Sequence, residues 1–160
     1  CKHSNAENDT NAPLLLTAPG LRHRGVRTNA LVEFVDIYPT LSELAGLPLP
    51  GHLEGLSFRP VLEDPPRIWK SAAFSQYPRS SDGRQLMGYS MRTPQYRFTA
   101  WMHRQDHSQI DAFELYDHRV DPQENRNLAN DAANAALVAK LTAQLRAGWR
   151  GALPGGSASR

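Results

Sequence analysis

The chain has 160 residues, enough for about one domain with a hydrophobic core. Its hydrophobic content of 40%, charged content of 21% and formal net charge of +2 are typical of a globular domain. The small net charge gives no support to a nucleic-acid partner, and no apolar run approaches the ~20 residues of a membrane span. One cysteine excludes an intrachain disulfide and leaves the compartment open, a periplasmic or secreted one included.

The first residues indicate a piece of a larger protein. The sequence begins with Cys1 rather than Met, and the polar cluster of residues 1–5 leads within a few residues into the apolar run 13–18. A free-standing domain usually opens with a dispensable terminus. We expect residues 6–12 to form a polar loop and residues 13–18 a short buried strand.

A basic stretch and a helical stretch follow. The cluster Arg22, His23, Arg24, Arg27 has no aromatic residue interleaved with it, as base stacking would require, so it predicts a solvated loop. From residue 30 to residue 47 apolar positions recur at spacings of three and four. The pattern predicts an extended or turn segment to about Ile37, then a helix with Pro39 in its first turn and Gly46 after its end. Residues 48–67, rich in proline and without a period, predict a surface loop.

The second half predicts a small antiparallel sheet and a helix. Four strand-like runs cover residues 71–77, 85–92, 96–102 and 113–117, separated by turn signals. Residues 131–149 carry one apolar stripe among alanines and predict a helix. The predicted fold is α+β in this chain: a four-stranded antiparallel sheet at residues 68–150 packed by a C-terminal helix. Residues 1–67 are predicted to end a larger α/β domain, and residues 151–160 to form a disordered tail.

Residue spacing alone does not distinguish the candidate site residues from residues with ordinary structural or surface roles. Lys2 could meet an anion at a strand entrance, but an ordinary surface lysine is the commoner case. His103 and His107 have the spacing of metal ligands on a helix, yet they follow a strand. Ser75 and Ser90 lack the Gly-x-Ser-x-Gly turn of an activated serine.

Three collinear stretches resemble sulfatases. Residues 2–5 with 13–15 and 19–20 resemble the segment that follows the metal-binding Asp-His pair of that family. Residues 35–41, Val-Asp-Ile-Tyr-Pro-Thr-Leu, resemble its V-D-x-aromatic-P-T-L helix together with Leu-Ala-Gly-Leu-Pro at 44–48. Residues 114–129 resemble its C-terminal E-L-Y-D…D-P-x-E-x-x-N-L-A turn. Residues 75–79 and 87–93 resemble the iduronate-2-sulfatase branch in particular.

The resemblance implies an alkaline-phosphatase-like α/β fold and a sulfuric ester hydrolase. Sulfatases of this type use a formylglycine nucleophile and a divalent cation, usually calcium. Lys2 aligns with a sulfate-contacting lysine, which makes it the implied catalytic residue. His3 and Arg79 are implied substrate-side groups, and for Arg79 a structural ion pair is an equal alternative.

The sequence differs from the sulfatase pattern in ways that indicate where the catalytic groups of the enzyme lie. The chain has no C/S-x-P-x-R motif for formylglycine, and the family's metal ligands are expected upstream of Cys1. The insert common in this branch is reduced to residues 80–84. The expected function is the C-terminal portion of a sulfatase that hydrolyses sulfate esters of acidic sugars, such as those of glycosaminoglycans, inert without the N-terminal part of the enzyme. A phosphodiesterase or phosphonate hydrolase of the same superfamily and a non-catalytic carbohydrate- or protein-binding module remain alternatives.

Overall fold

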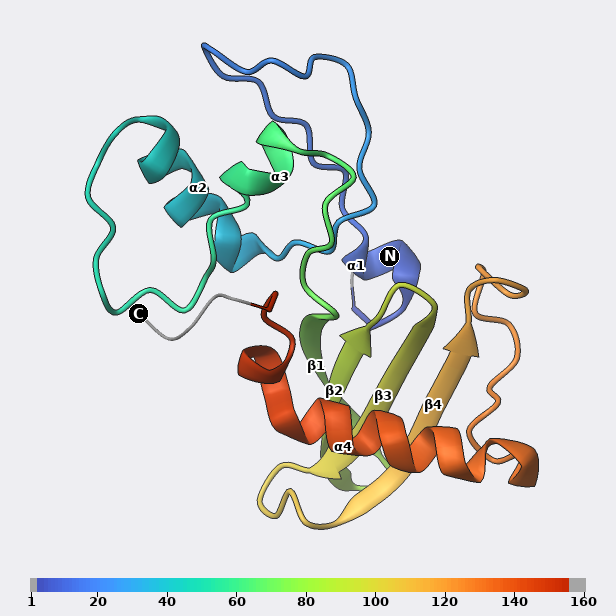
Figure 1. Ribbon diagram of the computed structural model, residues 1–160. Helices are drawn as coiled ribbons and strands as arrows, with labels where there is room; N and C mark the ends of the chain where they lie inside the picture. Colours follow the sequence, from blue (N-terminus) through green and yellow to red (C-terminus); the bar gives the residue numbers. More distant parts are fainter. Residues whose placement is uncertain (1–2, 156–160) are drawn as a thin grey trace. The chain divides into compact units, whose positions relative to one another are not determined.

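The computed structural model describes residues 3–155, which form two compact units (Figure 1). The first, the sheet unit, comprises the chain up to Pro13 together with Phe74–Ala152. The second, the loop unit, comprises Leu14–Ala73 and the described residues from Leu153 onward. The expected domain division between residues 67 and 68 concerns a larger protein and stays a prediction.

The sheet unit is built on four sequential strands. These pair with their sequence neighbours in the order β1 (Ala73–Ser81), β2 (Arg84–Arg92), β3 (Tyr96–His103) and β4 (Ile110–Asp117). Asp82 and Gly83 join β1 to β2 with positive φ angles of 49° and 77°, as a two-residue hairpin turn requires. All four predicted strands are thereby confirmed.

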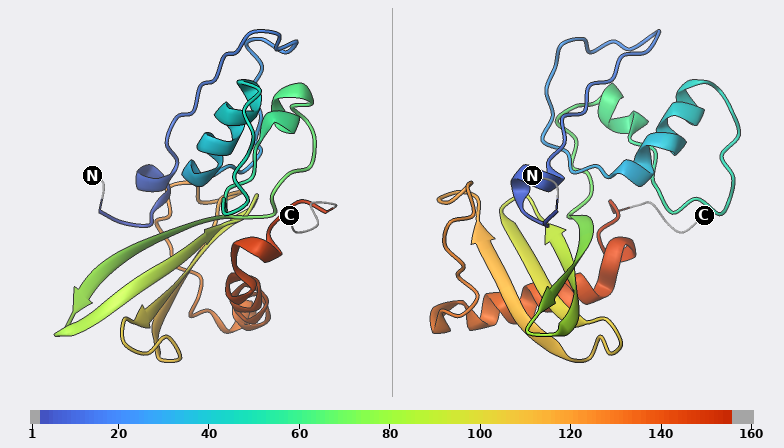
Figure 2. Two further views of the ribbon diagram at one scale, coloured as in Figure 1. Left: turned by 90° about the vertical axis from the view of Figure 1, so that its left-hand side faces the viewer. Right: turned by 180° about the vertical axis from the view of Figure 1, so that it is seen from behind.

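The two faces of the sheet carry different side chains. Met91, Phe98 and Leu115 point to one face and are fully buried. Helix α4 (Ala135–Gly151) lies across that face and buries Leu141 and Leu145 (Figure 2). Directly opposite residues of paired strands share a face, so the other face, which we call the polar face, carries the residues Gly88, Ser90, Thr99, Trp101 and Glu114. Helix α1 (Glu7–Thr10) covers part of the polar face (Figure 2).

The predicted C-terminal helix is confirmed with small changes at its ends. A short 3-10 turn, η2 (Ala132–Asn134), precedes α4, and the helix bends at Gly148, whose φ is 65°. Order continues past the predicted end at residue 149, since Ala152 is buried. Of the predicted tail, residues 156–160 lie outside the described residues.

Three short helical segments form the loop unit. They are η1 (Phe34–Asp36), α2 (Ile37–Leu44) and α3 (Arg59–Glu63). Helix α2 has Pro39 in its first turn and ends at Leu44, two residues before Gly46, where φ is 69°. The N–H groups of Gly46 and Leu47 close this end by donating to the carbonyls of Glu43 and Ser42. The predicted helix and its glycine stop are confirmed.

A buried ion triad fixes the core of the loop unit. The Lys70 ammonium donates to the Asp36 carboxylate at 2.7 Å and to Glu33 at 2.8 Å, and the Asp36 side chain is fully buried. Asp36 also accepts from the backbone N–H groups of Glu33 and Leu56. Beside the triad lies an apolar cluster centred on the buried side chains Phe58, Val61 and Trp69. The aspartate of the Val-Asp-x-aromatic-Pro-Thr motif is therefore a structural group here.

Three sequence predictions are wrong in this structure. Residues 13–18 form no strand, and Leu15 is 91% exposed, because no strand lies beside this segment within residues 3–155. Residues 6–12 contain the helical turn α1, because a side chain from far along the chain holds its first N–H group. The predicted loop 48–67 contains α3, whose Val61 packs into the apolar cluster.

Among the described residues, every helix is too short or too polar to cross a bilayer.

The ion triad gives a direct stability test. Lys70→Met should lower the free energy of unfolding by about 3–5 kcal/mol, because it leaves the Asp36 carboxylate buried without its cation. Urea denaturation followed by circular dichroism measures the change. Lys140→Met, at an exposed position of α4, is the control and should shift stability by no more than about 0.5 kcal/mol. A Lys70→Met chain as stable as the wild type would contradict a structural role for the triad.

Candidate functional site

Asn5 holds the N-terminal segment on the polar face. Its side-chain amide donates to the Gly88 carbonyl at 2.9 Å and accepts from the Ser75 hydroxyl at 3.1 Å. Asn5 is only 4% exposed. A Cβ at position 88 would lie 2.7 Å from both the Asn5 amide nitrogen and the Trp101 ring, so only glycine permits this close approach. Glycine in the middle of β2 therefore sets the place of residues 3–5.

Of the residues predicted for substrate contact, His3 lies next to β1. Its imidazole is exposed and stacks on the Tyr77 ring, with centroids 5.8 Å apart and an interplanar angle of 11°. Tyr77 and Arg79 are two residues apart on β1, so their side chains point to the same face of the sheet, the polar face. The structure thus brings the predicted residues His3 and Arg79 to one surface. Lys2, the predicted catalytic residue, lies outside the described residues.

Arg79 is held by an aromatic ring and a carboxylate. Its guanidinium carbon lies 3.7 Å from the centroid of the Trp101 ring, within the range of a cation–π contact. Glu114 accepts from the Trp101 indole N–H at 2.8 Å and lies 3.6 Å from an Arg79 nitrogen. The Arg79 side chain keeps about a third of its surface exposed. The ion pair is therefore present, and it leaves part of the Arg79 side chain exposed although its Nε is buried without a hydrogen-bond partner among the described residues.

A buried charge network fastens α1 to the same face. The Arg97 guanidinium, 3% exposed, donates to Glu124 at 2.7 Å, to the Thr10 hydroxyl at 2.8 Å and to Glu7. Glu124 accepts from the Glu7 backbone N–H at 2.8 Å and so satisfies the open end of this single helical turn. His118 lies 2.8 Å from Glu124. The network fixes α1 and, through it, the segment that carries Asn5 and His3.

Charges around this network shift two pKa values. Burial alone would raise the pKa of Glu7, but the nearby Arg92, Arg97 and His118 outweigh it and bring the pKa below its ordinary value of 4.5. Burial, helped by the negative charges of Glu114, Glu124 and Asp121, raises the pKa of Tyr116 to about 12. Glu7 is therefore ionised and Tyr116 neutral at physiological pH.

The described residues do not fit a calcium ion. One cluster, Glu7, His118 and Glu124, brings three ligand atoms within 4.8 Å of one another. Arg97 already donates to both carboxylates, so a cation there would meet a fixed positive charge. Calcium also takes 6–8 oxygen ligands, more than this cluster offers. His107, from the predicted histidine pair, lies 3.3 Å from the Tyr89 hydroxyl.

Comparison with known proteins decides the family. Residues 2–150 match the family described as N-sulphoglucosamine sulphohydrolase, C-terminal. The chain belongs to this family of sulfatase C-terminal regions. The predicted sulfatase resemblance and fold class are confirmed, because solved sulfatases carry the same arrangement of strands and helices.

Individual relatives support the sulfatase assignment. The chain is 30% identical to iduronate 2-sulfatase of Mus musculus, over 88% of this chain and 37% of that protein. It resembles the solved structure of a 2-O GAG sulfatase with a TM-score of 0.56 and 28% identity, over 70% of this chain and 23% of that one. It also resembles phosphonate monoester hydrolase of Agrobacterium radiobacter with a TM-score of 0.50 and 27% identity, over 70% and 24%. The chain thus spans between about a quarter and two fifths of the length of these relatives.

Sequence reasoning missed the residues that support Arg79 and His3. The sequence pattern places Asn5, Trp101 and Glu114 in a motif or a strand and does not show which residues they contact. One local signal was available for their arrangement, since a glycine inside a strand often marks the close approach of another segment, as at Gly88. Asn127 shows why the family turn is polar: its side chain accepts from the Leu115 N–H and donates to the Phe113 carbonyl.

The close approach at Gly88 can be tested in the sulfatase chain. Gly88→Ala should displace Asn5 and break the two hydrogen bonds of its side chain, worth about 1–3 kcal/mol together. Amide hydrogen exchange of residues 5–10 should then accelerate by about 10- to 100-fold. Gly51→Ala is the control, because a Cβ at position 51 meets no atom within 4 Å. Unchanged exchange in Gly88→Ala would mean that Asn5 does not hold this segment.

The lowered pKa of Glu7 predicts an acid-sensitive contact. A carboxylate whose folded pKa lies below its unfolded value stabilises the fold above about pH 4.5, and this contribution disappears as the pH falls through the folded pKa. Unfolding free energies of the wild type and of Glu7→Gln, measured from pH 7 to pH 3, should therefore converge at the acid end. A constant difference across this range would exclude ionisation of Glu7 as the cause.

Proposed function

We propose that this chain is the C-terminal portion of a sulfatase that hydrolyses sulfate esters of acidic sugars. The family match over residues 2–150 carries the proposal. The identity of 30% to an iduronate 2-sulfatase over most of the chain supports an acidic sugar as substrate, since iduronate carries a carboxylate. Degradation of glycosaminoglycans is the biological setting that this substrate implies.

Each predicted site residue has a proposed task. Lys2 contacts the sulfate group and neutralises charge that develops on its oxygens as the ester bond breaks. Arg79 and His3 contact the sugar, where the Arg79 side chain meets the carboxylate and the imidazole meets a hydroxyl. The shared surface of His3, Tyr77 and Arg79 supports this assignment for the substrate side.

The nucleophile and the metal ligands belong to another part of the enzyme in this proposal. The sequence contains no C/S-x-P-x-R motif, and the cluster around Arg97 does not fit calcium. Formylglycine and a divalent cation, calcium by resemblance, are therefore assigned to the N-terminal part of the sulfatase.

An apolar surface supports the N-terminal part as the partner. Outside residues 21–28 the loop unit exposes eight large hydrophobic side chains, which is more than scattered surface residues account for. They are Leu14, Leu15, Phe34, Val35, Tyr38, Leu41, Leu47 and Ile68. The relatives are about three to four times as long as the segment they share with this chain, which provides enough protein to cover such a surface.

A phosphonate or phosphodiester hydrolase is the second candidate. The structural likeness to a phosphonate monoester hydrolase favours it specifically. Sulfate and phosphonate esters present similar tetrahedral oxygens to a lysine, so the residues of this chain serve either substrate. Activity of the full-length enzyme against an aryl sulfate and an aryl phosphonate separates the two.

Substitution of Lys2 tests the proposal. In the full-length enzyme Lys2→Ala should lower kcat on a sulfated uronate substrate by about 100-fold or more, because one group that stabilises the transition state is lost. The 160-residue chain alone should release no sulfate above background. Arg119→Ala, at an exposed position of the sheet unit, is the control and should keep wild-type turnover. A near-normal rate in Lys2→Ala would remove this lysine from the site.

A further inference from the structure

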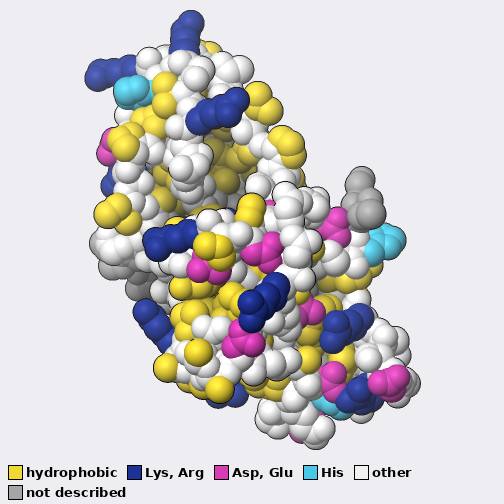
Figure 3. All heavy atoms as spheres, turned by 90° about the vertical axis from the view of Figure 1, so that its right-hand side faces the viewer, with side chains coloured by type: hydrophobic (Ala, Val, Ile, Leu, Met, Phe, Trp, Pro, Cys, Tyr) yellow, Lys and Arg dark blue, Asp and Glu magenta, His cyan; other side chains and the backbone are white. Residues whose placement is uncertain are grey.

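One basic loop of the sulfatase chain has no role in the proposed site. Residues 21–28, which we call the basic loop, contain three arginines and a histidine, and all four side chains are exposed. Between residues 10 and 32 the sequence has no Asp or Glu. Figure 3 shows the result, since dark blue and cyan side chains predominate at the top of the view, where this loop lies. The loop therefore carries a concentrated positive charge.

The arginines of the basic loop form no ion pair with a carboxylate of the described residues. Within residues 3–155 no carboxylate lies within ion-pair distance of Arg22, Arg24 or Arg27. Six arginines elsewhere do have such a partner: Arg59, Arg79, Arg84, Arg92, Arg97 and Arg126. Unpaired guanidinium groups keep their full capacity to donate bidentate hydrogen bonds to an anionic ligand.

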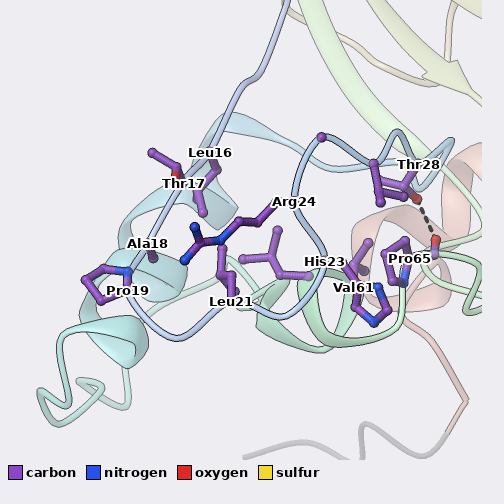
Figure 4. Close-up of a pocket in the computed structure, with 13 residues that line it drawn as sticks. Leu16, Thr17, Ala18, Pro19, Leu21, His23, Arg24, Thr28, Val61 and Pro65 are labelled. Carbon is purple, nitrogen blue, oxygen red and sulfur yellow. Dashed lines mark hydrogen bonds between the residues drawn. The ribbon is translucent and has the colours of Figure 1, made fainter.

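The basic loop borders a hollow in the surface of the loop unit. The hollow has a volume of about 500 Å³, and its walls include apolar side chains such as Val61 and Leu62. Figure 4 shows the Arg24 side chain extending toward the preceding segment, residues 16–19. Thr28 donates to the Pro65 carbonyl at 2.8 Å and so ties one end of the loop to the unit (Figure 4). The charges are thus presented beside a concave surface.

We propose that the basic loop binds a sulfated polysaccharide chain through Arg22, Arg24 and Arg27. Several unpaired arginines on one loop suit a ligand with repeated anionic groups, and guanidinium groups bind tetrahedral oxyanions well. A single-stranded nucleic acid is disfavoured, because residues 10–33 contain no Phe, Tyr or Trp on which a base could stack. The anion-binding surface follows from the loop itself, and the choice of a sulfated carbohydrate rests on the proposed function.

Binding of a defined oligosaccharide tests the inference. Titration calorimetry of the 160-residue chain with a heparin octasaccharide at low salt should show binding that weakens steeply with salt, as expected when counterions are released. The variant Arg22→Gln/Arg24→Gln/Arg27→Gln should bind about 10-fold or more weakly, since three charge contacts are lost. Its salt dependence should also be shallower than that of the wild type.

A matched control removes the same charge elsewhere. Arg104→Gln/Arg119→Gln/Arg146→Gln changes three exposed arginines of the sheet unit and should bind within about twofold of the wild type. Absence of binding by the wild type, or equal weakening in both triple variants, would overturn the inference. Equal affinity for a desulfated octasaccharide or for a single-stranded DNA of the same charge would overturn the ligand class. Because binding needs no turnover, these results are distinguishable from a failure of the Lys2→Ala test.

Discussion

The guanidinium of Arg97 decides how the first described residues meet the sheet. It lies between Glu7 from α1 and Glu124 from the turn after β4, and it is almost fully buried. A buried charge of this kind costs several kcal/mol unless its partners are in place, so the three side chains form one unit that is stable only when complete. The position of α1, and hence of Asn5 and His3 on the polar face, depends on that unit.

The loop unit uses the same physical device with the charges reversed. There a fully buried carboxylate, Asp36, receives a lysine ammonium and two backbone N–H groups, and the adjacent Thr40 hydroxyl donates to the Asp36 carbonyl. The resemblance to sulfatases rested partly on this Val-Asp-x-aromatic-Pro-Thr segment. Its polar members hold helix α2 to the chain around Leu56 and Phe58, so their role in this chain is architectural.

What the sequence predicted correctly was local. The turn signals between the strand-like runs located the hairpin that joins β1 to β2, and Gly46 located the end of α2. Each of these features is decided by neighbouring residues, so spacing alone reveals it. Helix α1 was missed because Glu124, 117 residues away, completes it.

The candidate site was likewise predicted only in its local features. Its strand positions followed from the pattern, and resemblance to the family singled out His3 and Arg79. The Trp101 ring and the Glu114 carboxylate that hold Arg79 come from two other strands, so only the pairing of β3 with β4 reveals them. The sequence also could not predict that residues 13–18 are largely exposed, since an apolar run does not show which segment covers it.

The joining of Glu7 to Arg97 has a consequence for synthesis on the ribosome. The two residues are 90 positions apart, and Asn5 is 83 positions from its partner Gly88. At ordinary translation speeds of about 5–20 residues per second, residues 3–10 emerge on the order of ten seconds before the strands that receive them. Throughout that interval His3 and its neighbours lack the strands of the sheet unit, so their contacts form only after β2 and β3 have been synthesised.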